Sequence, residues 1–159
     1  MNTASKMIRI FLVVVVATLI MGRQAQAGVS CHKINAKGEG QGAPPPAGFE
    51  AGTVATIKGG GLLQGTTNAG FNFTSPPNPA GFEGFITFIT NKATLTVDIA
   101  GTFDVLSGDF YAEGPVSDAT GKLAGATGFL VFEGVQDLGS VTGEFVETVT
   151  GEICVDLAP

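Results

Sequence analysis

Hydrophobic and polar residues alternate along most of the chain beyond residue 30, as they do in strands that bury one face and expose the other. In one such segment, Leu95 and Val97 share the apolar face, whereas Thr94 and Thr96 share the polar face. Glycine, proline, asparagine and aspartate separate these runs at short intervals. No stretch after residue 27 keeps a helical period. The sequence therefore predicts an all-β antiparallel domain, and the clearest strands are residues 65–74, 93–105 and 109–116.

The first and last alternating segments carry the two cysteines of the chain, Cys31 and Cys154. Each cysteine belongs to the polar set of its segment, so both side chains are expected to point outward. An even pair of cysteines in an exported chain suggests a disulfide. A disulfide at these positions would join the first strand to the last, and this pairing closes a sheet into a barrel without free edges. We therefore predict a single small antiparallel β-barrel with a terminal disulfide.

Residues 1–27 have the pattern of an export signal. Lys6 and Arg9 precede an apolar run at residues 10–21, and Ala25-Gln26-Ala27 is a small-residue cleavage site. The apolar run is short for a membrane span, which needs about 20 residues. We therefore expect a signal peptide at 1–27, a β-barrel domain at 28–159 and a secreted or periplasmic protein. The alternative is an uncleaved N-terminal anchor, the one case in which we expect contact with a membrane.

Charge excludes one large class of partners. Cleavage after residue 27 removes three of the eight Lys and Arg residues and none of the 14 acidic residues, so the domain has a formal charge of −9 and no arginine. Nucleic-acid binding depends on Lys and Arg against phosphates. We therefore expect neither nucleic-acid binding nor binding to an anionic membrane surface, and the acidic balance is explained by solubility.

Two polar side chains, His32 and Glu147, fall among the inward-facing positions. A carboxylate in an apolar lumen is costly unless it has a partner, so Glu147 is a weak candidate for a functional group. The alternatives are that a bulge turns it outward or that a backbone donor satisfies it. If Cys31 lies opposite Cys154, His32 lies opposite Ile153, about 20 Å from Glu147 at the usual rise per residue. This spacing argues against a His–Glu pair.

Residues 85–89 and 129–135 are apolar on both faces. Such strands need a cover on their outer side, which a loop, another layer or an oligomer partner would provide. In the last segment, the apolar set is expected to begin at Val141. A short echo, Gly-x-Leu-x-Gly-x-Thr, occurs at residues 61–67 and again at 121–127. It is either a remnant of a duplicated hairpin or chance in a chain rich in Gly and Thr.

Residues 114–128, GPVSDATGKLAGATG, precede an apolar strand and the run VTGEFVETVTG. Together they resemble the closing hairpins of allene oxide cyclase-like and dirigent-like proteins. Residues 120–128 match the core of the glycine-rich corner of these families, with Leu123 in the aromatic position. The resemblance implies a barrel of about eight strands whose lumen binds an apolar molecule. In the cyclases, an oxidised fatty acid is isomerised there. None of their catalytic residues can be matched onto this sequence, and the lack of arginine argues against a dirigent-type site.

Other catalytic patterns are poor. G-x-S-x-G, H-E-x-x-H and P-loop motifs are absent, and we expect no cofactor and no metal site. Paired carboxylates of the glycosidase type stay open, because their pairing is spatial. The first hypothesis is an apolar small molecule bound in the lumen, and the second is a cyclase or isomerase that uses Glu147. The third is a structural or surface homo-oligomer. These hypotheses favour a non-enzyme, and an enzyme is the alternative. The expected ligand-lining residues, for which core packing is the alternative, are Phe71, Phe73, Phe103, Phe110 and Phe145.

Overall fold

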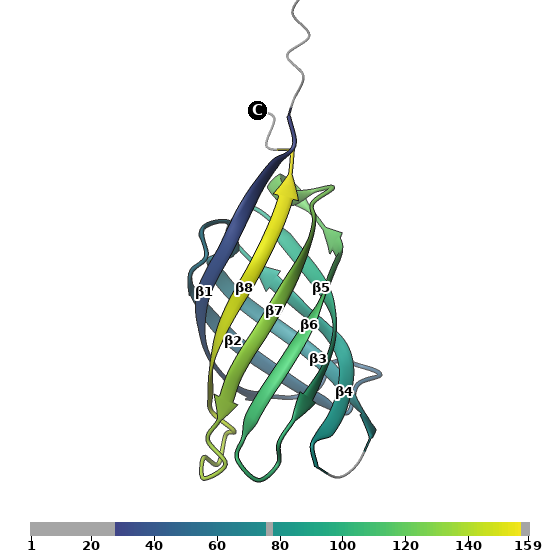
Figure 1. Ribbon diagram of the computed structural model, residues 1–159, viewed down its shortest axis with the longest axis vertical. Helices are drawn as coiled ribbons and strands as arrows, with labels where there is room; N and C mark the ends of the chain where they lie inside the picture. The colour runs from purple at the N-terminus through teal and green to yellow at the C-terminus, as the bar shows by residue number, and fades with distance from the viewer. Residues whose placement is uncertain (1–27, 76–77, 157–159) are drawn as a thin grey trace, which may run out of the picture.

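The computed structural model describes residues 28–75 and 78–156, and the expected signal peptide at 1–27 lies outside these residues. The described chain forms one closed sheet in which every neighbouring pair of strands is antiparallel (Figure 1). The predicted antiparallel barrel of eight strands is therefore confirmed. Its strands are β1 (Ser30–Ala43), β2 (Ala51–Gly59), β3 (Gly65–Ser75), β4 (Ala80–Ile89), β5 (Thr94–Phe103), β6 (Asp109–Ala119), β7 (Thr127–Gln136) and β8 (Phe145–Val155).

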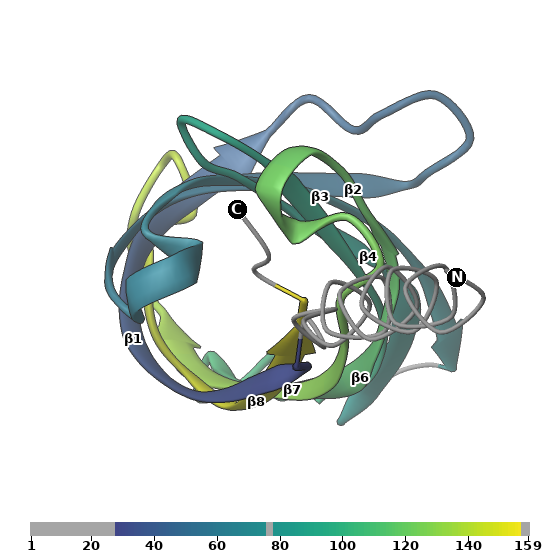
Figure 2. The same cartoon turned by 90° about the horizontal axis from the view of Figure 1, so that it is seen from above.

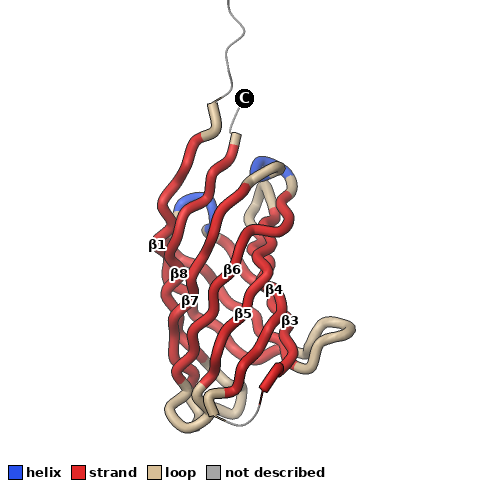
Figure 3. Tube along the Cα trace, turned by 45° about the vertical axis from the view of Figure 1, so that its right-hand side comes forward, coloured by secondary structure: helices blue, strands red, loops and turns tan. Residues whose placement is uncertain are grey.

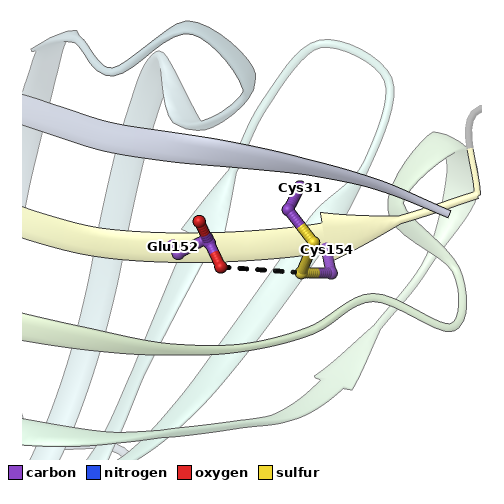
Figure 4. Close-up of a disulfide and its surroundings, with 3 residues drawn as sticks. All are labelled: Cys31, Glu152 and Cys154. Atoms are coloured by element: carbon purple, nitrogen blue, oxygen red, sulfur yellow. Dashed lines mark hydrogen bonds between the residues drawn. A yellow bond between two sulfur atoms is a disulfide. The ribbon is translucent and has the colours of Figure 1, made fainter.

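The barrel closes where β1 pairs with β8, and the predicted register is confirmed: Cys31 lies opposite Cys154 and His32 opposite Ile153. The two cysteines form a disulfide on the outer face, across 123 positions of sequence. Figure 4 shows Glu152 beside it, with Oε1 3.9 Å from Sγ of Cys154. A disulfide sulfur carries no proton to donate, so this is a contact of the oxidised pair. Both sulfurs are bonded to each other, which leaves neither available as a metal ligand.

The inward and outward sides of the strands follow the period-2 pattern. Along β8, the odd-numbered Val149 and Ile153 are fully buried, whereas the even-numbered Val146 is 54% exposed. The register shifts by one at two places among the described strands, at residue 74 of β3 against β4 and at residue 117 of β6 against β5. Two expectations at strand ends are wrong. Val141 lies in the loop before β8 and is fully exposed, and Val105 lies in the turn after β5 with 43% of its surface exposed.

The two ends of the barrel differ. At the end that carries the chain termini, two short 3₁₀ turns, η1 (Gly61–Leu63) and η2 (Gly121–Leu123), lie in the connections after β2 and β6 (Figure 3). Gly61 and Gly121 have φ values of 57° and 59°, a left-handed conformation that favours glycine. Leu63 and Leu123 are almost fully buried and join the core below them. The sequence echo at 61–67 and 121–127 therefore forms two equivalent turns at one end of the barrel. Each turn inserts one leucine, Leu63 or Leu123, into the core, and we call these two turns the plugs.

These turns are three residues long, and among the described residues no helix is long and apolar enough to cross a membrane. Seen along the barrel, the strands form a ring, and the loop of residues 44–50 projects beside it (Figure 2). Phe49 of this loop packs edge-on against Phe85 of β4, with ring centroids 5.0 Å apart. The loop thus covers part of the doubly apolar run at 85–89. In the other run, Phe129 and Val135 stay 46% and 41% exposed.

Candidate functional site at the open end of the barrel

The end opposite the plugs holds a cavity of about 330 Å³. Its lining comes from the inward faces of the strands and from the base of the loop between β7 and β8. The structure places all five phenylalanines expected in the lumen on this lining, together with two that the sequence did not assign. The lining phenylalanines are Phe71, Phe73, Phe82, Phe103, Phe110, Phe132 and Phe145.

The aromatic rings contact one another around the cavity. Phe71 lies 5.3 Å from Phe82, and Phe110 lies 5.8 Å from Phe145, both as distances between ring centroids. Contacts of this kind fix ring orientations beyond the effect of burial. Phe73, 48% exposed, carries this aromatic lining to the rim. The lining phenylalanines therefore contact one another from the interior of the cavity to its opening.

Inward-facing glycines make room for these rings. A Cβ atom added to Gly40 would lie 2.3 Å from the ring of Phe145, and one added to Gly134 would lie 2.4 Å from the ring of Phe110. The rings thus lie against bare backbone of the neighbouring strand, a use of glycine that is common where side chains or ligands need close approach. The glycines keep the rings near the wall, and this leaves the centre of this half of the barrel open.

Glu147 lines the same cavity. It lies on β8 between two glycines, Gly38 of β1 and Gly134 of β7. A Cβ atom on Gly38 would come within 2.5 Å of Oε1 of Glu147, so the carboxyl group lies over this glycine. Within residues 28–75 and 78–156, no hydrogen bond or ion pair reaches the carboxyl group. Burial raises its pKa from 4.5 to about 7.

A carboxyl group with this pKa is present in both protonation states near neutral pH, so it can donate or accept a proton or a hydrogen bond. The alternative in which a bulge turns Glu147 outward does not occur, because β8 keeps its register with both neighbours. The cavity offers few other polar side chains, among them Gln136, Thr53 and Thr67. The site thus combines a large apolar surface with one ionisable group.

His32 does not belong to this site. It lies on β1 opposite Ile153, at the end of the barrel with the chain termini, whereas Gly38 six positions further along β1 lies opposite Glu147. Its Nε2 atom is buried without a hydrogen-bond partner among the described residues. The structure therefore does not bring the two predicted inward polar side chains together, in agreement with the spacing argument from the sequence.

Sequence comparisons are negative: no protein-family model matches the chain, and no curated protein shows significant similarity to it. Among solved structures, the pterocarpan synthase dirigent protein GePTS1 superposes with a TM-score of 0.51 over 86% of this chain and 91% of its own, at 12% identity. The chain has a dirigent-like barrel fold. At this identity the likeness concerns the fold alone, and the allene oxide cyclase-like part of the resemblance stays a prediction. The cavity at the open end of this dirigent-like barrel, and Glu147 within it, are described from the residues of this chain and do not depend on the comparison.

Proposed function

We propose that this dirigent-like barrel is an exported protein that binds an apolar small molecule in the cavity at its open end. The observation that carries the proposal is a cavity of about 330 Å³ lined by seven phenylalanines and by Glu147. Its volume is at the lower end of the range for small-molecule sites, about 300–1,000 Å³. The disulfide is consistent with an oxidising compartment and so with export by the predicted signal peptide.

The chemistry of the lining defines the ligand class. Apolar surface drives binding by removal of water, and a few polar groups orient the ligand. Here the polar contacts come from the Glu147 carboxyl group and the Gln136 amide. The ligand is therefore a mainly hydrocarbon or aromatic molecule with one hydroxyl, carbonyl or amine group that meets Glu147.

The test is a fluorescence titration with the neutral apolar probe N-phenylnaphthylamine. Ala69 lines the cavity and is buried, so Ala69→Leu fills the space and should weaken probe binding about tenfold or more. Ala100→Leu makes the same change on the exposed outer face of β5 and should leave binding as it is. Equal affinity of both variants and the wild type, or no binding at all, would contradict the proposal.

A second candidate, a cyclase or isomerase, is favoured by the buried carboxyl group with a pKa of about 7 in the cavity. Native mass spectrometry of protein from its natural host identifies the bound molecule, and turnover of that molecule is then measured with Glu147→Gln. Binding without turnover in both proteins leaves a carrier, whereas turnover lost only in the variant favours an enzyme. An empty higher oligomer would favour the third hypothesis, a structural role for the exposed face with Phe129 and Val135.

A further inference from the structure

Large apolar side chains project into solvent around the mouth of the cavity. Leu106 is 79% exposed, Leu138 is 49% exposed and Val141 is fully exposed. Leu106 lies in the turn between β5 and β6, and the other two lie in the loop between β7 and β8. Figure 1 shows both connections at the end of the barrel opposite the chain termini. Exposed apolar side chains grouped at one end commonly mark a contact surface.

The turn that carries Leu106 is held by hydrogen bonds. Oδ1 of Asp104 accepts from the backbone N–H of Leu106 at 2.8 Å and from that of Ser107 at 3.2 Å. The N–H of Gly108 donates to the carbonyl of Asp104 at 2.8 Å. The bonds from Leu106 and Ser107 hold the pKa of the Asp104 side chain below its ordinary value, because they stabilise the carboxylate. Leu106 is thus presented to solvent on an ordered turn.

The loop that carries Leu138 and Val141 is ordered in the same way. Oδ1 of Asp137 accepts from the N–H of Gly139 at 2.8 Å. The carbonyl of Thr142 accepts from the N–H of Gly42 at 2.9 Å, which ties the loop to the end of β1. Little conformational freedom is left to lose when the apolar side chains enter another phase. Two separate loops therefore hold apolar side chains ready at one opening.

We infer that the mouth of the barrel docks on the surface of a neutral lipid bilayer, with Leu106, Leu138 and Val141 entering the interface. The inference rests on the proposed function, because docking supplies the source and destination of the apolar ligand. It departs from the sequence expectation, which allowed membrane contact only through an uncleaved N-terminal anchor. A molecule that fits the phenylalanine-lined cavity partitions into lipid, and the cavity opens where the apolar loops lie. Docking of this end lets the ligand pass between bilayer and cavity without crossing water.

The arrangement favours lipid over a protein partner. The side chains are three in number and lie on two separate loops, and backbone groups of both loops already bond within them. A few exposed apolar side chains can enter a fluid interface one by one, whereas a stable protein interface needs a large complementary area. Acidic side chains flank these apolar residues and no lysine lies in either loop, so a neutral surface is favoured over an anionic one. These acidic residues are Asp104, Asp109, Asp137 and Glu144.

The test is co-sedimentation of the disulfide-bonded barrel with phosphatidylcholine vesicles. Val141→Thr removes an apolar group from the mouth and should weaken vesicle binding about tenfold, and Leu106→Ser should do the same. Val146→Thr makes the matched change on the outer wall, where Val146 is 54% exposed, and should leave binding unchanged. Vesicles that contain phosphatidylserine should bind less protein than neutral vesicles.

No sedimentation of the wild type, or equal loss in Val141→Thr and Val146→Thr, overturns the inference. Circular dichroism of each variant shows whether the barrel is folded. Binding of N-phenylnaphthylamine in vesicle-free solution is measured on the same samples. Probe binding without vesicle binding refutes the docking inference and leaves the proposed function standing. Vesicle binding that depends on Val141, without probe binding, refutes the proposed function and leaves the docking surface.

Discussion

Burial of Glu147 makes the stability of the barrel depend on pH in a direction that can be worked out. One pKa unit corresponds to about 1.4 kcal/mol, so a rise of the pKa from 4.5 to about 7 means that the ionised form costs the folded state about 3 kcal/mol. Below pH 4.5 the group is protonated in both states, so it costs the folded state nothing and the free energy of unfolding is at its highest with respect to this group. As the pH rises towards 7, the unfolded chain loses the proton before the folded chain does. The free energy of unfolding therefore falls across this window and is level above it.

The change Glu147→Gln removes the titration and keeps the size of the side chain. The variant should match the wild type at about pH 4.5 and exceed its free energy of unfolding by about 3 kcal/mol at about pH 8. Urea unfolding followed by far-UV circular dichroism measures both proteins at each pH. The difference between them isolates Glu147, because the other carboxyl groups are shared. Glu144→Gln, which replaces an exposed carboxyl group just before β8, serves as the control.

A difference between Glu147→Gln and the wild type that is the same at both pH values would refute the reasoning. It would mean that the carboxyl group is ionised as easily in the barrel as in the unfolded chain. The same variant also tests whether the barrel is an enzyme that uses Glu147. Loss of turnover together with a gain of stability at high pH would mean that the carboxyl group serves the reaction at the expense of the stability of the fold.

Three further changes test the barrel itself. Replacement of Cys31 and Cys154 by serine should lower the free energy of unfolding by about 5 kcal/mol in the chain-entropy model, since the bond spans 123 positions; unchanged urea midpoints would contradict it. Leu123→Ala should cost about 2–5 kcal/mol, because its side chain plugs one end; thermal unfolding checks this, and a loss below about 1 kcal/mol would argue against a plug. Gly38→Ala should displace the Glu147 carboxyl group, so the pH dependence described above should shrink; an unchanged dependence would contradict the packing.

The sequence was sufficient for the closure of the barrel. A strand has a side-chain period of two, so the outward position of Cys31 and of Cys154 already constrained how the first and last strands face each other. The same parity placed Glu147 inward, and the register on both sides of β8 agrees with it. Alternation over long strands is reliable because a one-residue slip would expose the whole core.

Strand ends and cross-strand surroundings could not be predicted in this way. Val105 and Val141 continue the alternation by residue type, but β5 ends before Val105 and β8 begins after Val141. Phe132 lies in a run that is apolar on both faces, where parity cannot choose a side. The space around Glu147 depends on Gly38 and on Gly134, which belong to other strands, so its environment required the register.

The disulfide between the first and last strands also has a mechanical consequence. The bond joins residues 31 and 154 covalently across the seam between β1 and β8. A force that pulls on Ser30 of β1 and on Val155 of β8 passes from one sulfur to the other and is not transmitted through the hydrogen bonds of the sheet. The oxidised barrel should therefore stay closed under a load that would unzip the reduced one.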